Sequence, residues 1–361
     1  MKALVTGGAG FIGSHVVDKL IENNIETKVL VSGFRSKNHP SIVNPKATII
    51  KGNLLDVDSL LIATKDVDMV FHLGGMFSHY CEKYPELTID VNIKGTWNLK
   101  KACVINGVKR IIYASSSFVY GQPTYRDYLK NQLEQCKEKL NRAVGDIGRI
   151  KTGQSPLYYT NWTMVPSEDM FHLSNEDKTF PVNEIDPTNP KDLLGITKIS
   201  SEKILQSTYP YKINYTILRL FNVYGPRQYP EDLYTSVVST WIKRALDRKS
   251  LVIHDDGTQS LDFNYVKDVA DAFVLAMNEH AENRIFNVGS GTSTTMNELA
   301  QLVNEITGNE APSFFNPSHP MFLKHVQADI GKIKSTLGWS PKVDMREGLR
   351  KTAEFFKESL K

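Results

Sequence analysis

The chain has little cysteine, little net charge and no long apolar run. Its three cysteines are an odd and widely spaced set, which indicates neither a disulfide framework nor a cysteine metal site. Nine scattered histidines show no metal-ligand spacing. We therefore expect no bound metal and a reducing, cytoplasmic environment.

Charge and hydropathy argue against two further classes of partner. A net charge of +3 without a basic run gives no reason to expect nucleic acid or an anionic membrane. No apolar segment approaches the roughly 20 residues that span a bilayer. The first predicted strand begins at residue 2, so we expect no signal peptide. A content of 41% hydrophobic and 23% charged residues is ordinary for a globular protein.

The first thirteen residues are the most informative segment. A short apolar run, Lys2–Thr6, predicts a buried strand, and the glycine-rich turn after it leads straight into an amphipathic helix. Gly7 permits a tight turn with positive φ, Gly10 lets the backbone approach a pyrophosphate, and Gly13 lets the helix pack on the strand. The free N–H groups and the dipole of that helix favour a diphosphate. This segment therefore predicts a dinucleotide site.

Strand-like and helix-like segments alternate up to about residue 120, which is typical of a doubly wound parallel α/β sheet. The further predicted strands are Thr27–Val31, Thr48–Lys51, Met69–Leu73, Arg110–Ser115 and Tyr215–Leu220. The main predicted helices are Phe11–Asn23, Val57–Thr64, a long one over Thr88–Asn106, Leu193–Thr208 and Leu233–Arg248.

One segment breaks this alternation. Between Gly121 and Pro181 about 60 residues have no βαβ character, which is too long for an ordinary connection. Its first part has the spacing of an amphipathic helix, and its second part is aromatic and polar. A surface subdomain or oligomer contact and a lid over a ligand are both open interpretations.

Several short motifs then occur in a specific order. After the glycine turn come Phe71–Gly75, Ser115–Gly121, Gly195–Lys198 and Arg219–Arg227. With them the chain resembles the extended short-chain dehydrogenases of the nucleotide-sugar epimerase/dehydratase family, of the UDP-glucose 4-epimerase type, apart from residues 122–180.

The resemblance implies three parts and a homodimer. Residues 1–121 plus 182–220 would form a Rossmann NAD(P)-binding domain, and 122–181 an insertion. Residues 221–361 would mainly form a smaller C-terminal substrate-binding lobe, with some return to the Rossmann domain. Dimerisation would use the helices at 88–106 and 193–208.

The resemblance also implies a set of cofactor-binding residues. These are Gly7, Gly10, Phe11, Ile12, Gly13, Ser32, Arg35, Asn53, Leu54, Leu73, Gly74, Gly75, Asn92, Lys198 and Phe221. Val31 stands where a carboxylate usually binds the ribose hydroxyls of NAD, and Arg35 could pair with a 2′-phosphate. The cofactor could therefore be either NAD or NADP. Alternatively, the basic residues form a solvated loop that binds no phosphate.

Catalysis in this family transfers a hydride between a sugar carbon and nicotinamide, and a tyrosine carries the hydroxyl proton. Ser116 falls on the catalytic serine or threonine, and Lys198 on the lysine four residues after the tyrosine. The tyrosine position holds Leu194, whose side chain carries no proton.

Three interpretations of Leu194 stay open. Another group supplies the proton, with Tyr158 and Tyr159 of the insertion as candidates. Alternatively, the protein binds its ligands but turns over little, or the chemistry needs no tyrosine.

The substrate side also departs from the family pattern. The resemblance assigns Ser116, Ser117, Asn222 and Arg227 to a nucleotide-linked sugar. Ser117 and Phe118 replace the acidic pair of the 4,6-dehydratases, and Phe118 replaces the glutamate of the decarboxylases. Leu261 replaces a common phosphate-binding arginine, and 319–322 lack another. We expect an NAD(P)-dependent oxidoreductase or epimerase with an atypical proton carrier. The alternative is a cofactor-binding, catalytically impaired regulatory or scaffold protein.

Overall fold

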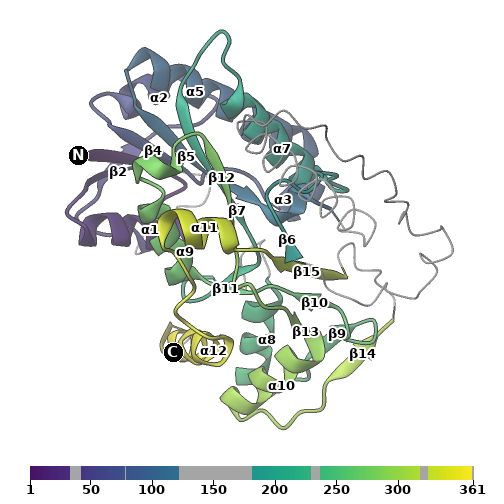
Figure 1. Cartoon of the computed structure of the whole chain (residues 1–361). Helices are drawn as coiled ribbons and strands as arrows, with labels where there is room; N and C mark the ends of the chain where they lie inside the picture. Colours follow the sequence, from purple (N-terminus) through teal and green to yellow (C-terminus); the bar gives the residue numbers. More distant parts are fainter. Residues whose placement is uncertain (33–41, 78, 122–180, 229–235, 318–323, 360–361) are drawn as a thin grey trace, which may run out of the picture.

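A computed structural model of the chain describes residues 1–32, 42–77, 79–121, 181–228, 236–317 and 324–359 (Figure 1). Within these residues a parallel sheet of seven strands forms the centre of the molecule. The strands are β1 (Lys2–Thr6), β2 (Glu26–Val31), β3 (Thr48–Lys51), β4 (Met69–His72), β5 (Arg110–Ser116), β7 (Asn214–Leu220) and β12 (Arg284–Val288). Their spatial order is β12-β7-β5-β4-β1-β2-β3, which confirms the predicted doubly wound sheet.

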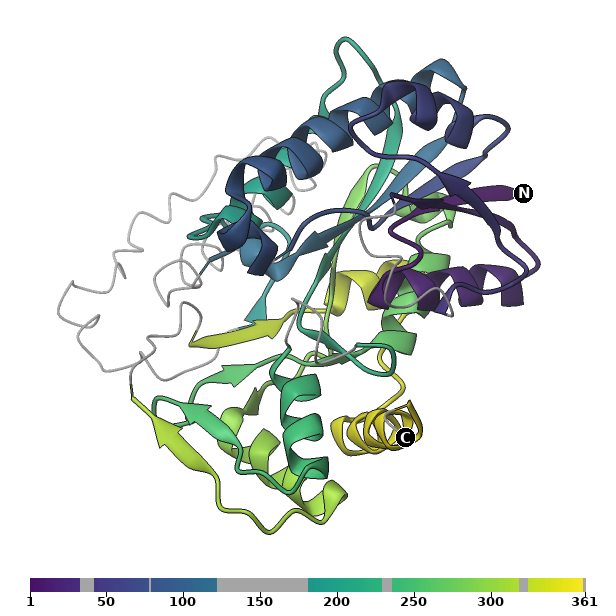
Figure 2. The same cartoon turned by 180° about the vertical axis from the view of Figure 1, so that it is seen from behind.

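Helices cover both faces of this sheet (Figures 1 and 2). One face packs on α1 (Phe11–Glu22), α9 (Val266–Leu275) and α11 (Gly331–Leu337), and the other on α2 (Val57–Thr64), α5 (Gly95–Ile105) and α7 (Leu193–Gln206). Neighbouring strand residues enter opposite cores: Val5 and Phe71 join the α1 side, while Leu4 and Val70 join the α2 side. Alternation along a strand explains this split, because successive side chains point to opposite faces.

The predicted long helix over Thr88–Asn106 is divided in the structure. It consists of α4 (Pro85–Ile89), a π-helical turn η2 (Asp90–Lys94) and α5. The short helix α3 (His79–Lys83) precedes it. A π turn inserts one extra residue into the helical repeat and often marks a functional position. Amphipathic spacing alone did not reveal it.

A smaller lobe lies beyond the carboxyl ends of the strands (Figure 1). Its helices α8 (Val237–Leu246), α10 (Met296–Thr307) and α12 (Met345–Ser359) pack on one another around an apolar core. Its short strands are β6 (Pro181–Val182), β8 (Val223–Tyr224), β9 (Val252–His254), β10 (Ser260–Leu261), β11 (Asn264–Tyr265), β13 (Thr294–Thr295), β14 (Phe314–Asn316) and β15 (His325–Ala328). The order β13-β10-β15-β6 forms one small sheet, while β11 pairs with β8 and β14 with β9.

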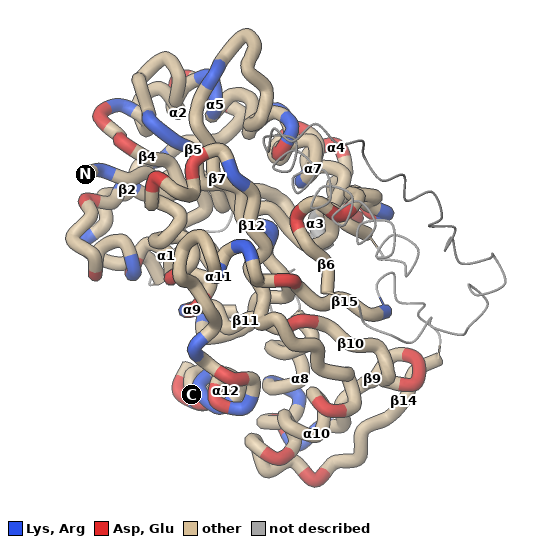
Figure 3. Tube along the Cα trace, viewed as in Figure 1, with Lys and Arg blue, Asp and Glu red and all other residues tan. Residues whose placement is uncertain are grey.

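Charged residues of both signs are interspersed along the face shown in Figure 3. In the described ranges no helix combines the length and the apolar character needed to cross a membrane. The predicted dimerisation through the segments that contain α5 and α7 stays a prediction.

Gly7 and Gly107 form a matched pair for testing the glycine turn. Both have a left-handed backbone, with φ of +72° and +69°. A Cβ on Gly7 would lie 2.7 Å from the backbone nitrogen of Gly74, whereas one on Gly107 would meet nothing within 4 Å. We expect Gly107→Ala to cost about 1–2 kcal/mol of stability through backbone strain alone. Gly7→Ala should cost clearly more, because the backbone after β4 must also move. Urea unfolding of the two variants measures the difference, and equal losses would contradict a close approach at Gly7.

Candidate active site

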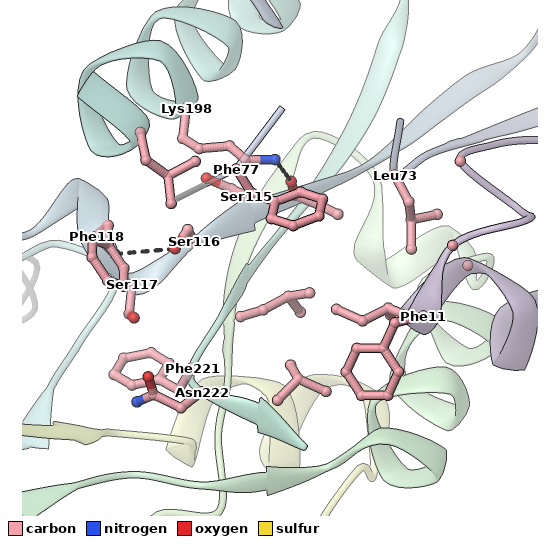
Figure 4. A pocket seen from close by; sticks show the side chains of 18 of the residues that line it. Phe11, Leu73, Phe77, Ser115, Ser116, Ser117, Phe118, Lys198, Phe221 and Asn222 are labelled. Atoms are coloured by element: carbon pink, nitrogen blue, oxygen red, sulfur yellow. Dashed lines mark hydrogen bonds between the residues drawn. The ribbon is translucent and has the colours of Figure 1, made fainter. Parts of the chain in front are cut away.

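A pocket lies where the carboxyl ends of the central strands meet (Figure 4). The chain passes from β3, at one edge, back to β4 beside β1, and parallel sheets bind ligands at such a switch point. The predicted residues that line it are Gly7, Gly10, Phe11, Ile12, Gly13, Leu73, Ser116, Ser117, Leu194, Lys198, Phe221 and Asn222. Segments far apart in the sequence are thus brought together at one site.

The glycine turn between β1 and α1 is built to receive an anionic group. The N–H of Gly10 donates to the carbonyl oxygen of Gly7 at 2.9 Å, and α1 begins at the next residue. No side chain caps this helix and no acidic residue lies in its first turn. Its first N–H groups are therefore available to a ligand. A Cβ on Gly13 would collide with the carbonyl oxygen of Gly7, so the turn keeps its shape only with glycine there. These features fit a dinucleotide diphosphate.

Helix α7 contributes Leu194 and Lys198 to the pocket lining, and Figure 4 shows Lys198 on the side away from Phe11. Asp192 caps the helix by accepting the N–H of Gly195 at 2.7 Å. A spacing of four residues puts positions 194 and 198 on one face of the helix. Leu194 is only 7% exposed, so this part of the pocket wall is apolar.

The ammonium group of Lys198 is held at the end of β5. Its Nζ donates to the carbonyl oxygen of Ala114 at 2.7 Å and stands 5.0 Å above the ring of Tyr113. Burial lowers the pKa of Lys198 to about 8. Ser116 ends the same strand, and its Oγ accepts the N–H of Phe118 at 3.2 Å.

A buried ion pair lies beneath these groups. Glu202 of α7 and Arg219 of β7 pair at 2.8 Å, and both side chains are at most 4% exposed. The hydroxyl of Ser115 donates to Glu202 at 2.5 Å, and Arg219 donates to the hydroxyl of Tyr120 at 2.9 Å. The network ties α7 to β5 and β7, and so holds Lys198 relative to Ser116.

Asn92 lies behind the pocket wall instead of lining it. It sits in the π turn η2, accepts the N–H of Met76 at 2.7 Å and donates to the carbonyl oxygen of Met76 at 2.9 Å. It also donates to Thr197 of α7 at 2.9 Å. A Cβ on Gly75 would lie 2.9 Å from Asn92 Oδ1, which explains the glycine there. Asn92 therefore shapes the segment after β4.

Other predicted cofactor residues follow strands β2, β3 and β4. Ser32 is exposed just after β2, and Asn53 Oδ1 accepts the N–H of Leu55 at 3.0 Å. Leu54 is buried, and its carbonyl accepts from Asn98 of α5 at 3.1 Å. Gly74 donates to Thr6 Oγ1 at 3.1 Å. These residues and Gly75 do not line the pocket, and their contact with a cofactor stays a prediction.

Three of the predicted residues cannot be placed. Arg35, Tyr158 and Tyr159 lie outside the described residues. The structure therefore tests neither a contact with a 2′-phosphate nor a proton carrier in the insertion.

The two predicted substrate residues after β7 differ in position. Asn222 lines the pocket and donates to the carbonyl oxygen of Asp262 at 3.1 Å. Arg227 pairs instead with Asp18 of α1 at 2.7 Å, beside the contact of His15 with the carbonyl of Pro226. The structure thus places Arg227 between the lobe and α1, outside the pocket lining.

Phe77 and Gln228 line the pocket but were absent from the sequence prediction. Gln228 is 2% exposed, and its Nε2 donates to the carbonyl oxygen of Val223 at 3.1 Å. Its Oε1 has no hydrogen-bond partner among the described residues, so a ligand donor could satisfy it. Gln228 directly follows the quoted Arg219–Arg227 motif, and extending that motif by one residue would have found it.

The profile of a family described as "NAD dependent epimerase/dehydratase family" matches residues 3–140 and 169–289. The crystal structure of UDP-glucose 4-epimerase with UDP-glucose from Thermotoga maritima shares 31% identity, covers 100% of both chains and has a TM-score of 0.80. A UDP-glucose 4-epimerase complex with NAD from Thermus thermophilus has 26% identity, covers 99% of each chain and has a TM-score of 0.76. A UDP-glucose 4-epimerase of Mycolicibacterium smegmatis is 29% identical, over 99% of this chain and 99% of its own.

The ion pair beneath the site generates a stability prediction. Glu202→Ala leaves Arg219 buried without its carboxylate, and we expect a loss of about 3–5 kcal/mol in unfolding free energy. Glu305→Ala is the matched control, because Glu305 pairs with Arg346 at 2.7 Å in an exposed position and should cost far less. Urea denaturation of both variants checks the contrast. Similar losses of unfolding free energy in the two variants would show that the buried pair contributes no more to stability than the exposed pair.

Proposed function

Because the chain belongs to the NAD dependent epimerase/dehydratase family, we propose that it is an NAD-dependent enzyme acting on a nucleotide-linked sugar. The proposed chemistry is epimerisation or simple oxidoreduction at a hydroxyl-bearing carbon, with an atypical proton carrier. The single observation that supports it best is the pocket itself. It brings the glycine turn, Ser116 and Lys198 together from β1, β5 and α7.

The proposed cofactor site uses the α1 end of the pocket. The turn from Gly7 to Gly13 would hold the diphosphate, and Lys198 the nicotinamide ribose. When bound, NAD supplies the chemistry of a hydride acceptor and donor. The apolar side chains of Phe11, Leu73 and Phe221 would exclude water from the site.

The proposed role of Ser116 is to orient the reacting hydroxyl. Its Oγ lies at the end of β5 and already accepts the N–H of Phe118, so its proton is free to point toward a substrate oxygen. Ser117 and Asn222 would contact the sugar nucleotide from the lobe side of the pocket. Phe118 stands where the decarboxylases and dehydratases of the family carry an acid, so chemistry that needs an acid there is disfavoured.

A second candidate function rests on a different observation. Leu194 is buried in the pocket wall, and Arg227 is engaged by Asp18. Both features would suit a protein that binds the cofactor but has lost turnover, and that acts as a regulator or scaffold. Hydride transfer from any nucleotide sugar separates the two functions.

In the experiment, purified protein is incubated with NAD and with UDP- and dTDP-linked hexoses that are deuterated at every ring carbon. We expect saturable NAD binding and transfer of deuterium to the nicotinamide, detected by mass spectrometry, with NMR reporting any changed sugar. Ser116→Ala should reduce the transfer about 100-fold with NAD binding retained. Ser200→Ala, whose hydroxyl donates to the carbonyl of Ile196 on α7, is the control.

Each failure of this experiment has its own meaning. Absence of NAD binding would overturn the proposed function in both of its forms. NAD binding with neither deuterium on the nicotinamide nor a changed sugar would favour the regulator or scaffold.

A further inference from the structure

The proposed chemistry needs a group that takes and returns a hydroxyl proton, and Leu194 cannot do so. Of the described side chains that line the pocket, Lys198 has the one amine, and no carboxylate, imidazole, thiol or phenol accompanies it. The hydroxyl of Ser115 is committed to Glu202 at 2.5 Å. Serine hydroxyls also hold their protons too strongly to act as a base at neutral pH. Lys198 is therefore the remaining candidate for the proton carrier among the described residues that line the pocket.

The surroundings of Lys198 favour its neutral amine. Among the described residues no carboxylate forms an ion pair with its Nζ, which donates only to the carbonyl oxygen of Ala114. Glu202, one turn further along α7, is engaged by Arg219 and Ser115. Burial then disfavours the charged form and lowers the pKa to about 8, so about a tenth of the amine is neutral at pH 7.

The other elements packed around Lys198 contribute little charge at neutral pH. From β4, His72 is buried between Thr6 and Thr96, and burial lowers its pKa to about 3, so it is neutral. From β5, burial raises the pKa of the Tyr113 hydroxyl, and its ring face gives the ammonium a modest cation–π attraction. From α3, burial raises the pKa of the Cys81 thiol. Glu202 is thus the charged neighbour, and it is already paired.

The leucine leaves room between the amine and the substrate. A leucine side chain ends well short of where a tyrosine hydroxyl would reach from the same backbone position. Lys198, Ser116 and Leu194 all line the pocket, so a water among them would have polar partners in the amine and the hydroxyl. Proton transfer through one such water is an accepted geometry for a general base.

We propose that Lys198 is itself the proton carrier of this site. In the oxidation, the neutral amine takes the sugar hydroxyl proton, directly or through one water. The O–H bond breaks, an N–H bond forms, and the hydride on the same carbon leaves to bound NAD as the C=O bond forms. In the reverse step the ammonium returns the proton. The proposal rests on the proposed function and identifies the group that carries the proton where position 194 has no tyrosine.

The first test measures Lys198 in the ligand-free protein. Trace labelling with acetic anhydride across pH 6–11 is read by mass spectrometry, with Lys203, exposed on the same helix, as internal reference. We expect the labelling of Lys198 to reach its half-maximum near pH 8. Labelling of Lys198 that still rises above pH 10 would overturn the proposal while leaving the proposed function intact.

The second test follows deuterium transfer against pH. Because the neutral amine is the base, oxidation should rise about tenfold per pH unit below pH 8 and level off above it. The midpoint should coincide with the labelling midpoint. Leu194→Tyr introduces a competing proton carrier. In that variant, the pH midpoint of deuterium transfer should therefore differ from the pH midpoint of Lys198 labelling. A kinetic midpoint in the unmodified protein that differs from the Lys198 labelling midpoint by more than one unit would overturn the assignment.

Loss of transfer in Tyr158→Phe or Tyr159→Phe, with NAD binding retained, would also overturn it in favour of the insertion. A protein that binds NAD but transfers no deuterium would remove the proton-carrier role together with the proposed enzyme. Labelling near pH 8, matching kinetics and transfer that survives both tyrosine changes would establish Lys198.

Discussion

The buried ion pair between Glu202 and Arg219 is the contact on which the geometry of the site depends. It joins α7 to β7, and through Ser115 it also joins α7 to β5. Two charges with almost no access to water must stay together, because separating them leaves an uncompensated charge in the interior. The pair therefore holds α7 in one position against the sheet. Lys198 lies one turn before Glu202 on the same helix, so the ion pair also fixes the position of Lys198 against the sheet.

This constraint explains why the position of α7 does not depend on the residue at 194, where the resemblance predicts a tyrosine. The residue at 194 contributes a side chain to the pocket wall, but it does not hold the helix in place. Asp192 caps the helix, Thr197 bonds to Asn92, and Glu202 binds the sheet. If position 194 is the family's tyrosine position, as the sequence predicts, a leucine there removes one proton-carrying group and leaves the scaffold around it intact. It also makes the wall more apolar, and an apolar wall favours the neutral form of a neighbouring amine.

The contacts between α1 and the smaller lobe suggest a second consequence of the fold. Arg227 and Pro226 contact Asp18 and His15, all of them outside the pocket lining. Burial lowers the pKa of His15 to about 4, so this contact is made by a neutral imidazole. Helix α1, whose N-terminus is the proposed diphosphate site, is thereby attached to the segment that follows β7. A residue assigned to substrate by its motif here joins two parts of the molecule.

Much of the fold could be predicted from the sequence because its signals are local. Apolar runs, glycines and helical spacing depend on neighbours a few residues apart, so six of the seven strands of the central sheet were predicted within one residue at each end. The seventh strand, β12, was not assigned. The π turn at Asp90–Lys94 was not predicted, because five residues are too few for the spacing of apolar side chains to distinguish a π turn from an α-helix. Gln228 and Phe77 also escaped prediction, although each lies within two residues of a quoted motif, because the local sequence does not show that their side chains face the pocket.

The sequence by itself determined the dinucleotide turn, the doubly wound sheet, and the presence of Ser116 and Lys198 without a tyrosine at 194. Only the tertiary structure decided that Arg227 pairs with Asp18, that Asn92 supports the wall, and that Lys198 lies partly buried without a carboxylate ion pair among the described residues. The reason is physical. Residue type specifies which chemistry a side chain can perform, whereas burial and neighbouring charge, which set its protonation state, arise from segments that meet only on folding.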